Sequence, residues 1–425
     1  MRMSDAGSLA VASDRLHEVS DRYTVDGIRP SQAWEVRGEN ELGEALTEAA
    51  TRRLAVIPYG AGSHLALGNP PARYDVALDL APFAGVLEYE PDDLTITVRA
   101  GTRLAEVQDL LARRRLSLPL DPPGAGRCTV GGMLATALTG PLRHGYGTPR
   151  DWVIGMRVAL ADGTFARSGG RVVKNVTGYD MHKLHIGALG TLGVIAEATF
   201  KLAPLPRAER ALGIAAPTAT AVCALAAAAQ RSGLPLLVVE ALAPPTAHAL
   251  TGLHGWALVL RLAGGPNAVA RAVREVHGLA DRSDATTAHD IDLATFDAAW
   301  HAAFHPDGLA VRISTRPSDV GRVLEPLDRR LAGRGAHISA TVCAGVTRAV
   351  IPAIDEAYAR AVLRDVRDIA ARAGGSVIVD AAPPAAKADG DVFGEPRPDW
   401  AIMRRLKDLF DPLRLLAPGR YLGRL

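Results

Sequence analysis

Two rhythms in the sequence predict an α+β fold built from successive domains. Up to about residue 207, short apolar runs alternate with helical stretches and with many glycine-rich loops. Beyond that point the glycine loops become sparse, and strands and helices follow one another in two similar rounds. The chain has 425 residues, of which 48% are hydrophobic, so it is long enough for two or three domains.

In the first part, the spacing of apolar residues predicts a helix over residues 41–54 that leads into a buried strand at residues 55–58. Residues 74–80 predict another strand. Residues 85–101 and 153–170 predict hairpins, with turns at PDD (91–93) and ADG (161–163). Residues 102–115 predict a helix that begins at a Thr102 cap and ends in three arginines, which suit the negative end of the helix dipole.

In the second part, two strand–helix–strand rounds predict an antiparallel sheet with helices on one face, in a ferredoxin-like rhythm. The proline-rich residues 383–399 predict an exposed loop before a last helix at residues 400–410. We therefore expect an N-terminal extension at 1–27, a first domain at 28–206, a second at 207–385, and at 386–425 a loop and return helix that packs on the first domain.

The composition excludes several classes of protein. The net charge of +2, from 48 basic and 46 acidic side chains, is too small to predict nucleic acid as a partner. The cysteines Cys128, Cys223 and Cys343 are widely spaced and odd in number, which argues against a disulfide framework and favours a reducing compartment. No apolar run is long enough for membrane insertion, and the N-terminus lacks a signal-peptide core, so we expect a cytoplasmic protein.

The strongest local motif is the small-residue turn at residues 58–68 (PYGAGSHLALG), directly after a predicted buried strand. Small residues let backbone N–H groups converge on an anion, and a diphosphate is the natural occupant. Taken alone this signal is weak, because glycine turns after strands are usually structural. It is not GxGxxG followed by a long helix, which disfavours a nicotinamide dinucleotide.

A second loop strengthens the prediction of a bound phosphate. Pro122 and Pro123 stiffen the chain, and residues 129–132 (TVGG) open a small-residue helix whose first N–H groups suit the same anion. Further glycines at residues 145–147 and 187–193 mark additional close approaches of the backbone. The loops together are too many to be unrelated turns, and they can share one ligand.

Seven motifs follow one another in a fixed order: PYGAGS (58–63), DPP with TVGGMLA (121–135), RHGYG (143–147), VIGMRVALADG (153–163), VVKNVTGYD (172–180), GALGTLGVI (187–195) and LAPLP (202–206). This series resembles the FAD-binding domain of the vanillyl-alcohol oxidase, or PCMH-type, oxidoreductases. Residues 171–195 and the tail LKDLFDPLRLLAPGR (406–420) further resemble the FAD-binding subunits of bacterial glycolate oxidases. The resemblance is dense over residues 28–206 and returns in the tail, whereas the middle of the chain matches in layout alone.

The resemblance implies a two-lobed FAD domain followed by an α+β cap. It places the FAD diphosphate on the loop at residues 59–63, the ribityl chain and ring near residues 129–132 and 146–147, and the backbone of Ile195 at the pyrimidine edge. The expected cofactor-binding residues are Tyr59, Gly60, Ala61, Gly62, Ser63, His64, Pro122, Pro123, Thr129, Gly131, Gly132, Tyr146, Gly147, Gly190, Gly193 and Ile195.

Two departures from the family bear on this loop. Some relatives attach FAD covalently through a histidine at the position of Ser63, whereas here His64 comes one residue later, so a noncovalent flavin is predicted. Ala61 replaces a glycine common in the family, which requires a negative or mildly strained φ at this residue.

The resemblance also implies hydride transfer from a small 2-hydroxy acid such as glycolate to the flavin, with a base for the hydroxyl proton and a cation for the carboxylate. Lys174, Tyr179 and Lys183 lie in a matching motif and are the candidate catalytic residues, with a solvated lysine, a core tyrosine and a surface lysine as equally plausible roles. His301 and His305 are four apart, but no third ligand is nearby, and no metal site is predicted.

The histidine-rich cap motif of the family's catalytic subunits is absent from this sequence. This absence favours a subunit that works beside a second FAD subunit and an iron–sulfur subunit, in a complex that could lie peripherally at the inner membrane. Three readings stay open: a subunit that oxidises a 2-hydroxy acid, a flavin electron-transfer subunit without a substrate site, and an autonomous alcohol or sugar dehydrogenase.

Overall fold

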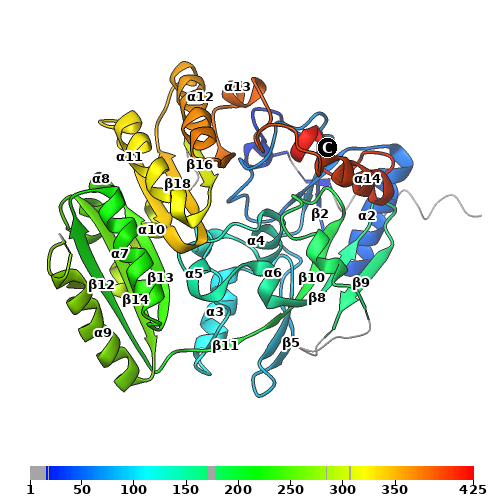
Figure 1. Cartoon of the computed structure of the whole chain (residues 1–425). Coiled ribbons are helices and arrows are strands. Elements are labelled where there is room, and N and C mark those ends of the chain that lie inside the picture. The colour runs from blue at the N-terminus through cyan, green and yellow to red at the C-terminus, as the bar shows by residue number, and fades with distance from the viewer. Residues whose placement is uncertain (1–15, 18, 171–177, 284, 306–307) are drawn as a thin grey trace, which may run out of the picture.

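The computed structural model describes residues 16–17, 19–170, 178–283, 285–305 and 308–425 (Figure 1). The chain forms a first domain of two lobes, a second domain built on one large sheet, and a C-terminal segment that returns to the first domain. In Figure 1 the blue to teal first domain lies on the right, and the green to orange second domain lies on the left and at the top. The two-lobed α+β architecture with an α+β cap is as predicted.

The first lobe is a four-stranded sheet in the order β1-β2-β4-β3, in which β2, β3 and β4 are parallel. Helix α2 packs on it through Leu42, Ala45, Leu46 and Ala49, whose spacing matches one face of a helix. The elements of this lobe are β1 (Leu16–His17), the 3₁₀ helix η1 (Asp21–Tyr23), β2 (Gln32–Glu35), α2 (Glu39–Arg52), β3 (Val56–Tyr59) and β4 (Val76–Asp79).

The second lobe is a five-stranded antiparallel sheet in the order β5-β6-β10-β8-β9. Both predicted hairpins are present, as β5–β6 and β8–β9. Its elements are β5 (Val86–Glu90), β6 (Thr95–Arg99), α3 (Leu104–Ala112), β7 (Leu116–Ser117), η2 (Ala125–Arg127), α4 (Val130–Thr136), α5 (Arg143–Tyr146), α6 (Pro149–Trp152), β8 (Val153–Ala159), β9 (Phe165–Gly169), η3 (Met181–Leu184), β10 (Val194–Lys201) and β11 (Ala203–Pro204).

The predicted cap at Thr102 is wrong. Helix α3 begins one residue later than expected, with Arg103 as its N-cap residue and no side-chain cap. The Thr102 hydroxyl instead accepts from the N–H of Gly85 at 2.9 Å and bonds to the Gly85 carbonyl at 3.2 Å. Thr102 therefore fastens the start of α3 to the neighbouring turn.

The second domain, which we call the cap, is an eight-stranded antiparallel sheet in the order β15-β12-β14-β13-β17-β18-β16-β19. Each half repeats one ferredoxin-like unit, and the two units meet where β13 pairs with β17. Its elements are β12 (Ala208–Ala216), α7 (Ala219–Arg231), β13 (Leu236–Leu242), α8 (Pro244–Thr251), β14 (Trp256–Gly264), α9 (Pro266–Asp281), β15 (His289–Ile291), α10 (Leu293–Ala303), β16 (Leu309–Ser314), η4 (Pro317–Asp319), α11 (Val320–Leu331), β17 (His337–Thr341), η5 (Val342–Ala344), β18 (Val346–Ile351), α12 (Glu356–Arg372) and β19 (Ser376–Ala381).

Helices α7, α9, α11 and α12 cover one face of the cap sheet and bury a large apolar core against it. The other face carries a smaller core that includes Phe296, Trp300 and Phe304 of α10, a helix that the sequence pattern did not predict. Part of this second face is turned toward the first domain, where α5 packs on β13.

The C-terminal segment joins the first lobe. Ala417 donates its N–H to the Val56 carbonyl at 2.8 Å, so the tail runs beside β3. The last helix, α14 (Trp400–Phe410), has the predicted bounds, and the 3₁₀ helix η6 (Leu422–Arg424) follows it. The preceding segment is not simply an exposed loop, because it contains the short helix α13 (Pro384–Ala388), whose Lys387 is buried. Within the described ranges, no helix is long and apolar enough to span a membrane.

Candidate active site

The glycine turn after β3 lines a hollow of about 580 Å³, which we call the loop hollow. Gly62 has a φ of +72°, and a Cβ at this position would lie 2.6 Å from the Tyr59 hydroxyl. A Cβ at Gly60 would lie 2.4 Å from Oγ1 of Thr129. Ala61 is not among the residues with positive φ, so it replaces a glycine without strain of the backbone. Gly60 is therefore required for close approach between the two lobes, and Gly62 for the turn itself.

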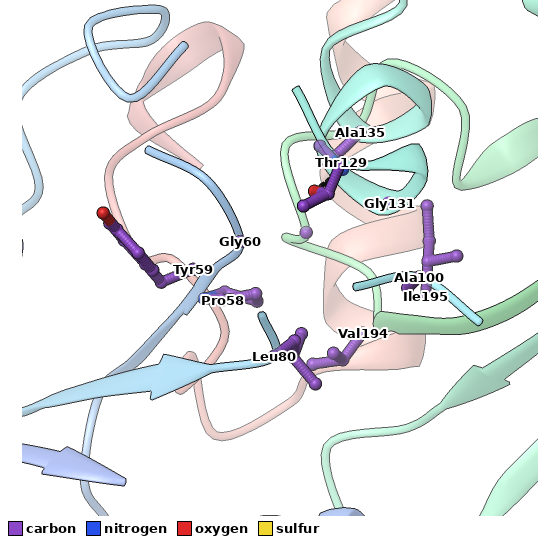
Figure 2. Close-up of a pocket in the computed structure, with 12 residues that line it drawn as sticks. Pro58, Tyr59, Gly60, Leu80, Ala100, Thr129, Gly131, Ala135, Val194 and Ile195 are labelled. Atoms are coloured by element: carbon purple, nitrogen blue, oxygen red, sulfur yellow. Dashed lines mark hydrogen bonds between the residues drawn. The ribbon is translucent and has the colours of Figure 1, made fainter. Parts of the chain in front are cut away.

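A second hollow of about 410 Å³, the apolar hollow, lies between the lobes next to the loop hollow. Figure 2 shows Pro58, Tyr59 and Leu80 on one side of it and Val194, Ile195 and the helix that begins after Thr129 on the other. Six residues line both hollows, namely Pro58, Gly60, Thr129, Gly132, Ala135 and Gly190. The two hollows therefore form one groove.

Thr129 is the N-cap of α4, and its hydroxyl accepts from the N–H of Gly132 at 3.2 Å. The small-residue helix predicted after this loop is thus present. Of the expected cofactor-binding residues, those that line the groove are Tyr59, Gly60, Ala61, Gly62, Ser63, His64, Thr129, Gly131, Gly132, Gly190 and Ile195. Those that do not line it are Pro122, Pro123, Tyr146, Gly147 and Gly193.

The His64 side chain is buried and turns from the groove toward the diproline loop. Its Nε2 donates to the Pro123 carbonyl at 2.8 Å, and its Nδ1 accepts from the Ser63 hydroxyl at 3.0 Å. Burial lowers the pKa of His64, which favours the neutral ring. Both nitrogens of this histidine are therefore engaged within the protein.

The histidines His301 and His305 of the cap, which are four apart in the sequence, lie beside the same diproline loop, that of Pro122 and Pro123. The His305 ring stacks on the His64 ring with 6.4 Å between centroids, and it lies against Gly124. Burial lowers the pKa of His301, whereas Asp297 and a backbone bond at Pro122 act in the opposite direction. No group of three or more His, Cys, Asp or Glu side chains in the described ranges is arranged to hold a metal ion. Both histidines therefore lie where the cap contacts the loop of Pro122 and Pro123.

A third hollow, of about 910 Å³, adjoins the loop hollow and shares Leu67, Thr136 and Leu189 with it. We call it the arginine hollow, because Arg143, Arg150, Arg312 and Arg397 line it. It bridges the domains: Arg143 belongs to α5 of the first domain, whereas Arg312 and Ile378 belong to the cap sheet.

The arginines differ in their partners. Nε of Arg312 donates to both carboxylate oxygens of Asp380 at 2.9 and 3.0 Å. The Arg143 side chain has no hydrogen bond or ion pair among the described residues, and both its burial and the nearby Arg312 lower its pKa. Two guanidinium groups thus line the same hollow at the domain boundary, and guanidinium groups suit the binding of a carboxylate or phosphate.

The turn that carries Arg143 is held from both domains. The Asp121 carboxylate accepts from the N–H groups of Gly140 at 3.0 Å and Leu142 at 2.8 Å. From the cap, Arg348 donates to the Thr139 carbonyl at 2.7 Å. Burial raises the pKa of Asp121 to about 7, although the two N–H groups and Arg348 act in the opposite direction.

Of the three candidate catalytic residues from the sequence, two lie away from the three hollows and one falls outside the described residues. Tyr179 is 89% exposed, and Lys183 forms a surface ion pair with Asp180 at 2.8 Å. Neither lines the three hollows. Lys174 falls in residues 171–177, outside the described residues. A catalytic role for these three residues stays a prediction that the described geometry does not strengthen.

Sequence reasoning missed the buried arginines of the cap. Arg348 is 4% exposed and lies in the strand sequence VTRAVI, in which every residue of β18 is buried. Arg312 occupies a similar place in LAVRIS of β16. An arginine within an otherwise apolar strand is a signal that could have marked both, since buried charges are rare without a partner.

Comparison with known protein families agrees with this geometry. Residues 30–169 match the family of FAD binding domains, and residues 391–421 match the C-terminal domain of FAD linked oxidases. The groove fits such a cofactor, because its wall of glycine, alanine and threonine leaves the backbone accessible beside an apolar recess.

Curated relatives match part of the chain. The glycolate oxidase subunit GlcE of Escherichia coli (strain K12) is 38% identical over 172 residues, which are 40% of this chain and 49% of that protein. The glycolate oxidase subunit GlcD of Bacillus subtilis (strain 168) is 34% identical over 176 residues, 41% of this chain and 37% of that protein. These matches span less than half the length of each relative.

Solved structures share the fold over nearly the whole chain. The structure of p-cresol methylhydroxylase with substrate bound has a TM-score of 0.73 and 16% identity, and the match covers 97% of this chain and 94% of that one. An alkyldihydroxyacetonephosphate synthase has a TM-score of 0.71 and 18% identity, with coverage of 93% and 78%. These structures agree with the two-lobed fold, and the match of residues 30–169 to the FAD binding domains gives FAD as the cofactor of this domain.

Proposed function

We propose that this chain is a subunit of an oxidoreductase that oxidises glycolate or a similar small 2-hydroxy acid with noncovalently bound FAD. One observation carries the proposal: the arginine hollow directly adjoins the cofactor groove, through Leu67, Thr136 and Leu189, and is lined from both the FAD domain and the cap. A small acid held there would lie beside the cofactor at the domain boundary.

The substrate carboxylate would bind between Arg143 and Arg312. The Arg143 side chain has no partner among the described residues, and Arg312 uses only its Nε for Asp380, so the remaining N–H donors of both can face an anion. A bidentate guanidinium bond is the commonest way in which proteins hold a carboxylate. When bound, FAD supplies the hydride acceptor, and these arginines orient the acid toward it.

The noncovalent attachment is supported by His64. Because one ring nitrogen donates to Pro123 and the other accepts from Ser63, this side chain would have to leave both bonds to react with the flavin. Ser63, which does line the groove, carries no group of the kind that forms such a link. A flavin that acid releases from the protein is therefore expected.

Electron transfer to partner subunits is supported by the names of the relatives, which are subunits of glycolate oxidases. We include in this proposal a second FAD subunit and an iron–sulfur subunit as the partners, in a cytoplasmic complex that lies peripherally at the inner membrane. The cysteines of the described chain are all unpaired, as a reducing compartment favours.

One observation favours a second candidate, a flavin electron-transfer subunit without a substrate site. Among the described residues that line the arginine hollow, none is a histidine, aspartate or glutamate that could take the hydroxyl proton. Tyr421 is the remaining acid–base group there, and burial raises its pKa, which makes it a poor base.

The absorbance spectrum of the purified chain tests both candidates. Flavin bands that bleach on anaerobic addition of glycolate or lactate would support substrate oxidation by this chain. Flavin bands that persist would favour the electron-transfer subunit, and a folded protein that cannot take up FAD would overturn the proposal. Acid precipitation of the same sample tests attachment, since yellow colour in the supernatant is expected and colour in the pellet would contradict it.

A further inference from the structure

The glycine turn at residues 59–64 is called the flavin loop below. The segment that follows it, residues 65–69, has an unusual backbone environment. Its five consecutive carbonyl oxygens all accept from two buried cations of the C-terminal segment. Arg420 donates to Leu65 at 2.6 Å, to Leu67, and to Asn69 at 3.1 Å. Lys387 donates to the two carbonyls between them, on Ala66 at 2.5 Å and on Gly68 at 3.4 Å.

A single carboxylate joins these two cations. Asp26 lies 2.5 Å from Nζ of Lys387 and 3.2 Å from Nη1 of Arg420, and the three side chains are at most 5% exposed. Two positive charges thus meet one negative charge. The cluster keeps a net positive charge inside the protein, where charges interact more strongly than they do in water.

This cluster adjoins the cofactor groove. Arg420 lines the loop hollow together with Gly62, Ser63 and His64, the residues just before the carbonyl segment. The neighbouring backbone is tied to the tail as well, because the N–H of Asn69 donates to the Arg420 carbonyl at 2.9 Å. The C-terminal segment therefore contributes to the path of residues 65–69 from outside the lobe that contains them.

We propose that Arg420 is a cofactor-positioning residue: through Asp26 and Lys387 it fixes the end of the flavin loop, and its charge favours the FAD diphosphate in the loop hollow. The inference rests on the assignment of FAD to this groove. The diphosphate is the doubly negative part of the cofactor, so it is the part whose binding depends on a nearby buried cation.

Equilibrium binding of FAD to the apoprotein tests this role. We expect Arg420→Gln to weaken FAD roughly 10- to 100-fold, the usual consequence of losing a charged hydrogen-bonding group. Arg420→Lys keeps the charge but not the fork of donors, and should lose less. Arg414→Gln is the matched control, because Arg414 lies in the same tail but pairs with Asp408 at the surface.

ADP and adenosine separate a role toward the diphosphate from general damage. Both ligands share the adenosine, and ADP alone adds the diphosphate, so Arg420→Gln should weaken ADP and leave adenosine within about twofold. The double variant Asp26→Asn/Arg420→Gln keeps the cluster's net charge of one positive unit but lacks the Arg420 guanidinium, so it tests the guanidinium itself. Circular dichroism establishes that each variant is folded.

The outcomes are distinguishable. A parent protein that binds neither FAD nor ADP would refute the proposed function itself. A parent that binds FAD, together with folded Arg420→Gln and double variants that bind FAD and ADP as tightly as the Arg414→Gln control, would overturn the role of Arg420. Equal losses for ADP and adenosine would also overturn it, because they would show general disruption of the groove.

Discussion

Nη2 of Arg348, on strand β18 of the cap, donates a hydrogen bond of 2.7 Å to the carbonyl oxygen of Thr139 in the FAD domain. Nη1 of the same side chain reaches the Thr341 hydroxyl at 3.2 Å. Beside it lies the fully buried Glu240, whose pKa is raised by burial and lowered by Arg348. One arginine thus joins the two domains and compensates a buried carboxylate.

Replacing Arg348 with methionine should lower the free energy of unfolding by about 3–5 kcal/mol, because it removes the charged hydrogen bonds to Thr139 and Thr341 and the cation that favours ionisation of Glu240. Urea denaturation measures the change. The matched variant Arg348→Met/Glu240→Gln removes the carboxylate charge as well and should recover part of the loss. A single variant as stable as the parent, or a double variant no better than the single one, would contradict this account.

Gly62→Val should abolish flavin retention without unfolding the cap. The backbone at Gly62 has a φ of +72°, and a Cβ there would lie 2.6 Å from the Tyr59 hydroxyl. Such a conformation costs a branched residue about 1–3 kcal/mol, so FAD affinity should fall at least roughly tenfold. Flavin content per folded chain is the measurement.

Gly265→Ala is the control for that variant, because no atom lies within 4 Å of a Cβ at Gly265 and its φ is −75°. It should keep the parent's flavin content. Normal FAD content in Gly62→Val would remove this glycine turn from the cofactor site.

Local chemistry made much of the fold predictable. The bounds of α14 agree with the sequence prediction, because its apolar spacing is uninterrupted between a proline-rich loop and Pro412. The hairpins β5–β6 and β8–β9 follow from turn residues, and the flavin loop from its small residues after a buried strand. Each of these signals lies within a few residues of the structure that it specifies.

The remaining features depend on partners that are distant in sequence. Arg348 and Thr139 are separated by 209 positions, and Arg420 and Leu67 by 353. A local pattern cannot name such partners. Thr102 shows the same limit, since a serine or threonine before a helix usually caps it, whereas here the hydroxyl bonds to Gly85. Lys387, in a segment expected to be exposed, is buried because Asp26 and two carbonyls receive it.

Arg143→Ala should raise the KM for a 2-hydroxy acid roughly 10- to 100-fold, because the substrate carboxylate loses a charged hydrogen bond. FAD content should stay at the parent's level, since Arg143 lines the arginine hollow and not the cofactor groove. Initial rates over a range of glycolate or lactate concentrations give KM. Arg143→Lys should recover part of the loss.

The exposed Arg231, at the end of α7, provides the control, and Arg231→Ala should leave KM unchanged. An unchanged KM in Arg143→Ala would place the carboxylate elsewhere. Bleaching of the Arg143→Ala flavin by substrate can be compared with that of the parent even if the chain turns over slowly without partners. Unchanged bleaching would also place the carboxylate elsewhere.

Asp121 should make stability depend on pH, because burial raises its pKa to about 7 in the folded chain, well above the value near 3.9 of an unfolded one. Between about pH 4 and 7 the folded chain therefore holds a proton that the unfolded chain has released. The free energy of unfolding should fall as pH rises through this window, and this contribution should be constant above it.

Asp121→Asn removes this titration and resembles the protonated parent. Urea denaturation from pH 4.5 to 8 should show a slope that differs between parent and variant by about one proton within the window. Asp92→Asn is the control, because the Asp92 side chain is 97% exposed and should not change the slope. Equal slopes for the parent and Asp121→Asn would mean that the carboxylate is already ionised when it holds Gly140 and Leu142, so that the turn before Arg143 is held equally well across this range.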